Sequence, residues 1–256
     1  MKKAENHIAE QVIRPTGIPD PVVEIRPTKN QMKTAISTLK KAKKKNERAF
    51  VVTITKRLAE DVAEYLTKEG LKVNYIHSEV NTLTRPVLMN KLRRGDFDVL
   101  VGVNLLREGL DIPEVSTVII FDADKEGFLR NRTTLLQTIG RAARHINGKA
   151  ILYADRTTNS MKQAIQETDR RRKKQEQYNK KHNITPKSVH KKIYETPQEL
   201  IEMEQERKHK DTIENASMKE LNRQMKQAAK DLDFERAAQI RDEIRQVETL
   251  ENKKSD

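Results

Sequence analysis

The chain has 256 residues and a formal net charge of +13, and charged residues are as frequent as hydrophobic ones, at 35% each. So little apolar material predicts one compact core together with long solvated helices. The lack of cysteine excludes disulfides, thiolate zinc sites and cysteine nucleophiles. No apolar stretch approaches the ~20 residues that span a bilayer, so we expect a cytoplasmic protein with an anionic partner and no membrane.

The basic excess is unevenly distributed along the chain. Residues 1–155 carry a net charge of +8 and residues 156–214 one of +5, whereas residues 215–256 are neutral. A neutral, amphipathic C-terminal segment is better suited to binding protein than DNA.

The pattern along the chain predicts four segments. The proline-rich residues 1–30 are expected to be extended. Thr28 and Gln31 have capping-box spacing, which predicts a helix that begins there and runs into the lysines between 40 and 45. We expect an α/β domain with a trailing helix over residues 31–182, a flexible linker over 183–214 and a helical hairpin over 215–251.

The α/β domain is predicted from short apolar runs that alternate with helical patterns. The runs are residues 50–54, 73–76, 99–103, 118–121 and 150–153. They are continuous rather than alternating, which is typical of parallel strands covered on both faces. The expected fold is therefore a doubly wound parallel sheet.

Two stretches of this domain suggest chemistry. Gln137, Gly140, Arg141 and Arg144 lie on one predicted helix, where two arginines three residues apart share a face and could clamp a phosphoryl group. We expect Gly140 to allow close backbone approach. Taken alone, the pair is equally compatible with a solvated helix surface.

The second stretch follows a predicted strand. The strand over 99–103 runs into a turn carrying Gly109 and Asp111, at the edge where open α/β sheets bind ligands. An ordinary strand-to-loop transition is the alternative, and the order of the two stretches makes it the weaker one.

Together these stretches resemble motifs V and VI of the second RecA-like domain of superfamily 2 helicases. Five stretches are similar in sequence to the UvrB family of bacterial excision-repair proteins, namely residues 14–17, 77–79, 105–114, 122–130 and 137–144. The resemblance covers residues 10–251. It implies arginine fingers at Arg141 and Arg144 and a nucleotide cleft lined by Gly109 and Asp111. Gln137 would connect that cleft to nucleic acid.

The sequence lacks the phosphate-binding Gly-x-x-x-x-Gly-Lys-Ser/Thr motif and an Asp-Glu magnesium motif on a strand. A nucleotide-hydrolysing motor needs both. If the resemblance holds, both belong to a first RecA-like domain that this chain does not contain. We therefore expect the C-terminal half of a longer protein, inactive alone, whose ATP site and Mg²⁺ are completed by that other half.

Hydroxyl and amide side chains follow three predicted strands and are candidate contacts to DNA phosphates. They are Thr53, Thr55, Ser78 and Asn104, and capping a helix or turn is an equally good interpretation of each. Aromatic residues make up only 4% of the chain, so phosphate contacts should dominate over base stacking. The basic block at 170–174 is more typical of a solvated helix face than of a DNA contact.

The C-terminal segment shows two short amphipathic stripes, the first preceded by a capping box at Ser217 and Glu220. It resembles the UVR domain of UvrB and UvrC. The resemblance implies docking to UvrC through Phe234, Ile240 and Ile244, or self-association, with UvrA a further partner of the complete protein. Packing of the hairpin back on the α/β domain is the structural alternative.

Two functions remain open at this stage. The first is an excision-repair subunit that acts as a DNA-dependent ATPase once complete. The second is a non-enzymatic adaptor whose α/β domain only scaffolds the hairpin. The phosphate-binding motif is absent, which favours the adaptor, and the arginine pair favours the motor.

Overall fold

A computed structural model describes residues 10–76, 84–103, 112–189, 192–197 and 199–201, together with nine residues between 220 and 241. The chain divides into two compact units, Met1–Tyr194 and Glu195–Asp256. Within the described ranges, no helix is both long and apolar enough to cross a bilayer.

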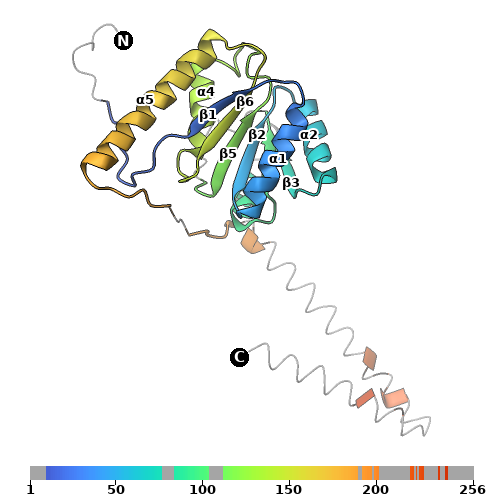
Figure 1. Ribbon diagram of the computed structural model, residues 1–256. Coiled ribbons are helices and arrows are strands. Elements are labelled where there is room, and N and C mark those ends of the chain that lie inside the picture. The colour runs from blue at the N-terminus through green and yellow to red at the C-terminus, as the bar shows by residue number, and fades with distance from the viewer. Residues whose placement is uncertain are drawn as a thin grey trace. The chain divides into compact units, whose positions relative to one another are not determined.

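The first unit is a six-stranded parallel sheet with helices on both faces (Figure 1). The strand order is β1-β6-β5-β2-β4-β3. The elements in chain order are β1 Val22–Arg26, α1 Gln31–Lys44, β2 Arg48–Val52, α2 Lys56–Lys68, β3 Val73–Ile76, α3 Thr84–Arg94, β4 Val99–Gly102, β5 Val115–Ile120, α4 Arg132–Ile139, the 3-10 helix η1 Gly140–Ala142, β6 Lys149–Tyr153 and α5 Asn159–Lys181. The predicted fold class is confirmed.

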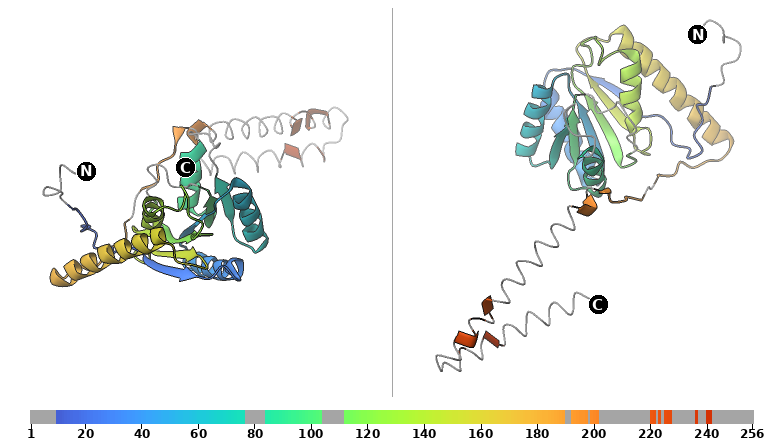
Figure 2. Two further views of the ribbon diagram at one scale, coloured as in Figure 1. Left: turned by 90° about the horizontal axis from the view of Figure 1, so that it is seen from above. Right: turned by 180° about the vertical axis from the view of Figure 1, so that it is seen from behind.

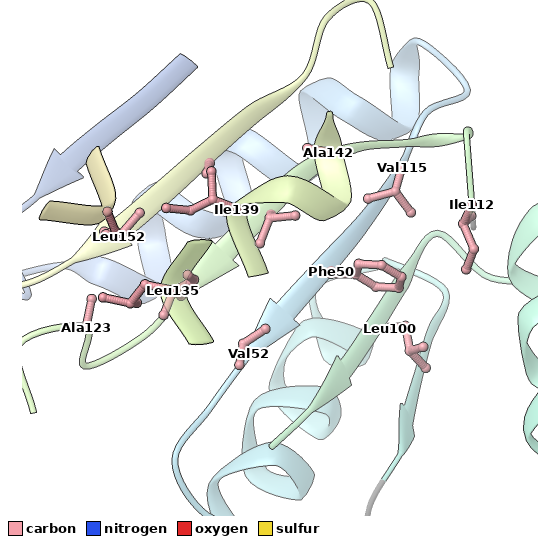
Figure 3. Packing of buried hydrophobic residues seen from close by; sticks show 14 of the residues in the cluster. Phe50, Val52, Leu100, Ile112, Val115, Ala123, Leu135, Ile139, Ala142 and Leu152 are labelled. Carbon is pink, nitrogen blue, oxygen red and sulfur yellow. The ribbon is translucent and has the colours of Figure 1, made fainter. Parts of the chain in front are cut away.

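The continuous apolar runs are buried because the sheet is covered twice. One core cluster joins the strands to α3, α4 and α5, and it includes Phe50, Leu100, Leu135, Ile139 and Leu152 (Figure 3). A second cluster joins the other face to α1 and α2, and the two views of Figure 2 show the helices in these two layers. Every residue of β2, β4 and β5 is buried, as the lack of alternation predicts.

Strand β1 lies within the segment that was expected to be merely extended. Val22 and Ile25 are 45% and 43% exposed because β1 is an edge strand that pairs only with β6. Pro21 and Pro27 flank it, and prolines next to an edge strand disrupt no ladder. The sequence signal of extension was therefore correct, but the pairing was missed.

The predicted capping box of Thr28 and Gln31 does not form at the start of α1. Asn30 occupies the N-cap position with φ 61° and makes no side-chain cap hydrogen bond. Thr28 instead donates its backbone N–H and its hydroxyl to Asp155, at 2.9 and 2.5 Å. These two bonds lower the pKa of the Asp155 carboxyl. Thr28 thus ties the end of β1 to the end of β6 rather than capping a helix.

Helix α5 holds the segment that precedes β1 through buried amides. Gln175 is fully buried, and its Oε1 accepts from Arg14 N at 2.7 Å. Asn179 donates to Gly17 O at 2.6 Å, and Gln175 donates to Asn179 Oδ1 at 2.9 Å. Beyond α5 the chain returns along the same segment, where Lys187 N donates to Thr16 O at 3.1 Å.

The basic block on α5 is paired within the chain. Arg170 and Lys174 both pair with Glu10, and Arg170 and Arg171 pair with Glu167. Hydrogen bonds from Arg170 above all, and then from Arg171, lower the pKa of Glu167 to about 2. This block is therefore an attachment point for the N-terminal segment.

The second unit is helical wherever the structure describes residues 220–241. A reciprocal capping box forms earlier, where Thr196 N donates to Glu199 Oε2 at 2.7 Å and Glu199 N donates to Thr196 Oγ1 at 3.2 Å. Ser217, of the predicted capping box, lies outside the described residues.

Candidate functional site

The carboxyl ends of the six parallel strands share one edge of the sheet, and two of the expected DNA-contact residues follow β2 there. Thr53 is fully buried, and its hydroxyl donates to Thr55 O at 3.1 Å. Thr55 is exposed and is the N-cap of α2, where its hydroxyl oxygen accepts from Leu58 N at 3.2 Å. The Thr55 hydroxyl hydrogen can still be donated, so Thr55 suits a phosphate and Thr53 shapes the turn.

Four other predicted site residues lie outside the described part of the chain. They are Ser78, Asn104, Gly109 and Asp111. The strands that lead to them are β3 and β4, which end at Ile76 and Gly102. Their expected roles in contacting nucleic acid and lining the nucleotide cleft stay predictions.

The arginine pair does not lie on one continuous α-helix as expected. Helix α4 ends at Ile139, and the chain continues as the 3-10 helix η1. Arg141 lies within η1 and is half-buried, whereas Arg144 follows η1 and is exposed. The tighter winding of a 3-10 helix changes the direction of each side chain from that of an α-helix. The two guanidinium groups therefore differ in their access to solvent.

The close backbone approach in this segment occurs at Gly148 and not at Gly140. A Cβ on Gly148 would lie 2.2 Å from Ala142 O and 3.0 Å from His145 O, so only glycine fits there. At Gly140, in contrast, no other group lies within 4 Å of a built Cβ. Gly148, which sequence reasoning missed, lets η1 pack against the start of β6.

Helix α4 spans the distance between the carboxyl edge and residues 140–145, which carry Arg141 and Arg144 and are here called the arginine segment. Asn131 caps it by accepting from Thr134 N at 2.9 Å, next to the loop that follows β5. Gln137 is exposed one turn before Arg141. Further on, Asn147 donates to Glu47 Oε1 at 3.0 Å, and Glu47 directly precedes β2. Arg144 therefore lies toward the amino ends of the strands.

Arg144 lines a cavity of about 420 Å³. Arg14, Thr16 and Ile18 of the N-terminal segment form one wall, and Gly140, Ala143 and Val189 contribute to the rest. Arg14 itself donates to Asp20 Oδ1 at 2.9 Å and to Ile18 O at 3.1 Å, which fixes that wall. Two guanidinium groups and a hydroxyl at one cavity are chemically suited to phosphate oxygens. In the described residues, no group of three His, Asp or Glu side chains is arranged to hold a metal ion.

Buried Arg130 is a further residue of this region that the sequence did not single out for a role. It is 2% exposed and donates to Phe121 O and Leu129 O, both at 3.0 Å. Burial lowers its pKa to about 10, against an opposing effect of Asp122, so it remains a cation at neutral pH. It joins the end of β5 to the loop that begins α4.

The residues predicted to bind a partner are described only in part. Ile240 is 8% exposed and helical. Phe234 and Ile244 lie outside the described residues.

Three family models match successive parts of the chain. They are the helicase conserved C-terminal domain over residues 30–146, ultra-violet resistance protein B over 152–194 and the UvrB/uvrC motif over 215–250. The C-terminal domain of the DEAD-box protein Dbp5 is 21% identical, with a TM-score of 0.43, over 61% of this chain and 86% of that one.

Curated relatives match almost the whole chain. UvrABC system protein B of Synechococcus elongatus is 51% identical over 96% of this chain and 39% of the relative. UvrABC system protein B of Natranaerobius thermophilus is 49% identical over 98% of this chain and 39% of the relative. The chain thus spans about two fifths of the length of these relatives, and over that length it belongs to the UvrB family.

Proposed function

We propose that this chain is part of a nucleotide-excision-repair subunit that hydrolyses ATP and acts on DNA once a first RecA-like half is present. The observation that carries the proposal is the identity of about half of all residues with UvrABC system protein B along nearly the whole chain. In this role Arg141 and Arg144 are the arginine fingers. The segment that carries them lies on the surface beside a cavity with a second arginine and a threonine.

ATP would be held between two halves, of which this chain supplies one. The guanidinium groups of Arg141 and Arg144 would hold phosphate oxygens by fork-like hydrogen bonds. Gly109 and Asp111 would line the same cleft, and Mg²⁺ would be held by the other half. Gln137 would connect the nucleotide cleft to DNA, and its exposed position in the last turn of α4, just before the arginines, supports that assignment.

DNA would be bound through its phosphates at the carboxyl edge of the sheet. Thr55 is the contact that the geometry supports best, because its hydroxyl is exposed at a helix N-terminus. Ser78 and Asn104 are proposed as neighbouring contacts. The affinity should be weak, independent of sequence and steeply dependent on salt.

The UvrB/uvrC motif over 215–250 would bind UvrC through a matching hairpin, with Phe234 as the anchor, Ile240 and Ile244 beside it, and self-association as the competing use. UvrA would be a partner of the complete protein. Ile240 is largely buried, so we assign it to packing within this segment rather than to the outermost contact.

The test supplies the missing half. ATP hydrolysis is measured for the chain alone and after a first RecA-like half of a curated relative has been joined or added. We expect no turnover from the chain alone and DNA-stimulated turnover from the combination. Arg144→Ala should then lower kcat by about 10³-fold, since that is the usual contribution of an arginine finger.

Arg132→Ala is the matched control, because Arg132 is an exposed arginine on the first turn of α4, the helix that precedes the segment with Arg144. If Arg132→Ala and Arg144→Ala have equal effects, the finger assignment is wrong. If the combination folds and binds DNA but shows no turnover, the adaptor function is favoured instead.

A further inference from the structure

The cluster of lysines that ends α1 has no part in the proposed ATP site. Helix α1 contains five lysines and no acidic residue, and Lys45 follows it directly. Its buried face is apolar and packs against the sheet, so the lysines lie on the solvent side. Lys41, Lys44 and Lys45 are exposed and share one face, since they are three and four residues apart.

This cluster lies at the amino edge of the sheet. Helix α1 leads into β2 and α3 leads into β4, and β2 and β4 are neighbouring parallel strands. Both helices therefore end near the amino ends of adjacent strands. Lys72, which directly precedes β3, and Lys91, in the last turn of α3, lie at the same edge. We call Lys41, Lys44, Lys45, Lys72 and Lys91 the lysine rim.

Buried Arg48 joins the ends of the two helices. Its Nε donates to Leu92 O of α3 at 2.9 Å, and its Nη2 donates to Asn46 Oδ1, just after α1, at 3.0 Å. The side chain packs so closely against Gly95, at φ 89°, that a Cβ there would lie 2.2 Å from Nη2. Arg48 thus fixes the ends of α1 and α3, which carry four of the five rim lysines at or near them, relative to each other.

Most acidic residues at this edge already have partners. Asp98 pairs with Lys43 at 3.2 Å, Glu69 with Lys40 at 3.0 Å and Glu114 with Arg93 at 3.1 Å. Glu47 accepts from Asn147. The three ion pairs use lysines and an arginine outside the rim, so they do not compensate its charge. Glu47 is bonded to a neutral amide and keeps its charge, which offsets one of the five rim lysines.

Stabilisation of helix ends does not explain so many lysines. A helix C-terminus carries roughly half a negative charge, which one lysine in the last turn can match. Lys40, Lys41, Lys44 and Lys45 also repel one another at helical spacings of three and four residues. A surface that keeps such repulsion in the folded state is suited to an anionic ligand.

We propose that the lysine rim binds the phosphate backbone of duplex DNA, on the edge of the sheet opposite Thr55. Protein interfaces are depleted in lysine and enriched in aromatic residues, methionine and arginine, so a surface made of lysines fits a nucleic-acid backbone better than an acidic protein. Lysine ammonium groups displace counterions from a duplex without reading its sequence. The inference does not rest on ATP hydrolysis.

The test measures binding of the full chain to a random-sequence DNA duplex over a range of salt concentrations. The rim variant carries Lys41→Glu, Lys44→Glu and Lys45→Glu. The control carries Lys173→Glu, Lys180→Glu and Lys181→Glu, which changes the net charge equally on exposed positions of α5. A second rim variant with glutamine at the same three positions removes the charges and also relieves their repulsion.

For both rim variants we expect at least tenfold weaker binding at low salt. We also expect a slope of log affinity against log salt that falls by about 0.9 for each lysine that contacts a phosphate. The control should keep the slope of the parent chain. Because the chain has no cysteine, a photo-crosslinker on Lys44→Cys should capture the duplex, and one on Lys180→Cys should not.

Three outcomes would overturn the proposal. The rim and control variants could lose affinity equally, which would mean that only net charge matters. The folded glutamine variant, checked by circular dichroism, could bind DNA as well as the parent. The rim variants could lose binding to poly-glutamate while keeping DNA binding, which would identify an acidic protein as the partner. Failure of the ATPase test would leave these binding results unaffected.

Discussion

Arg130 illustrates how one buried side chain can fix the geometry of a loop. Its guanidinium donates to the carbonyls of Phe121 and Leu129 and has only 2% of the residue's surface exposed. These carbonyls lie at the end of β5 and at the beginning of the turn into α4. The cation thus sets where α4 begins, and with it the direction of the arginine segment that follows.

We expect Arg130→Met to lower the free energy of unfolding by about 1–3 kcal/mol, because the two carbonyls lose their donor in a buried place. For a domain of this size, that corresponds to a fall of about 2–12 °C in the melting temperature. Thermal unfolding followed by circular dichroism measures it. The exposed Arg132→Met should change stability by less than about 0.5 kcal/mol. Equal effects of the two substitutions would show that the buried contacts of Arg130 contribute nothing.

The sequence could predict the role of a residue that depends on its neighbours in the chain, but not the role of one whose partner is distant in the sequence. The capping alternative for Thr55 is confirmed, because a hydroxyl just after a strand and before a helix has few possible roles. Its contact with DNA stays a prediction. Thr28 had the spacing of a cap, yet Asp155, at the end of β6, takes both of its hydrogen bonds. Gln175 and Asn179 look like solvated helix positions in the sequence, and they are buried because the N-terminal segment around Arg14 and Gly17 packs on them.

At the scale of elements, the packing of the segment from α4 to β6 depends on Gly148 and not on Gly140. Gly140 ends α4 with right-handed helical dihedral angles, φ −61° and ψ −13°, in open space. Gly148 lies against two carbonyl oxygens of the arginine segment. An added methyl group is therefore tolerated at Gly140 but clashes with backbone at Gly148.

Gly148→Ala should destabilise the chain by about 1–3 kcal/mol and displace η1, because the contacting atoms belong to backbone that cannot rotate away. Gly140→Ala should instead be neutral or stabilise by about 0.4–1 kcal/mol through the unfolded state. Urea unfolding of both variants measures the difference. If Gly148→Ala proves as stable as the parent, the close packing of η1 on β6 is not present in solution.

Elements with strong, continuous apolar patterns were predicted well. β3 has the predicted bounds, and β2, β4, β5 and β6 differ by a few residues at their ends. β1 was missed because an edge strand between prolines lacks the apolar run of a buried strand. The end of α4 was missed because an α-helix and a 3-10 helix share the same local residue preferences, and packing around Gly148 decides between them.

At the scale of the whole molecule, the chain consists of two compact units. The first carries the sheet and both core clusters, and the second begins at Glu195. Because both clusters are made of residues before 165, the sheet does not need the second unit for its apolar core.

Deletion of residues 215–256 should therefore leave the melting temperature of the first unit within about 2 °C of the parent, while pull-down of UvrC is lost. Phe234→Ala should weaken the same binding by ~2 kcal/mol or more, as substitution of an aromatic anchor does. Calorimetry and pull-down on the same preparations check both effects. Retention of UvrC by the truncated chain would remove the docking role from this segment.

The contact between Thr16 and Lys187 has a mechanical consequence. Residues before β1 and residues after α5 run side by side, joined by the bond from Lys187 N to Thr16 O. The side chains of Gln175 and Asn179 hold the first of these two strands of chain to α5 itself. A force applied along the chain, from upstream of Arg14 to downstream of Lys187, is carried first by this short bridge. While the bridge holds, tension bypasses the strands of the sheet, and the unit should resist pulling until these few bonds shear together.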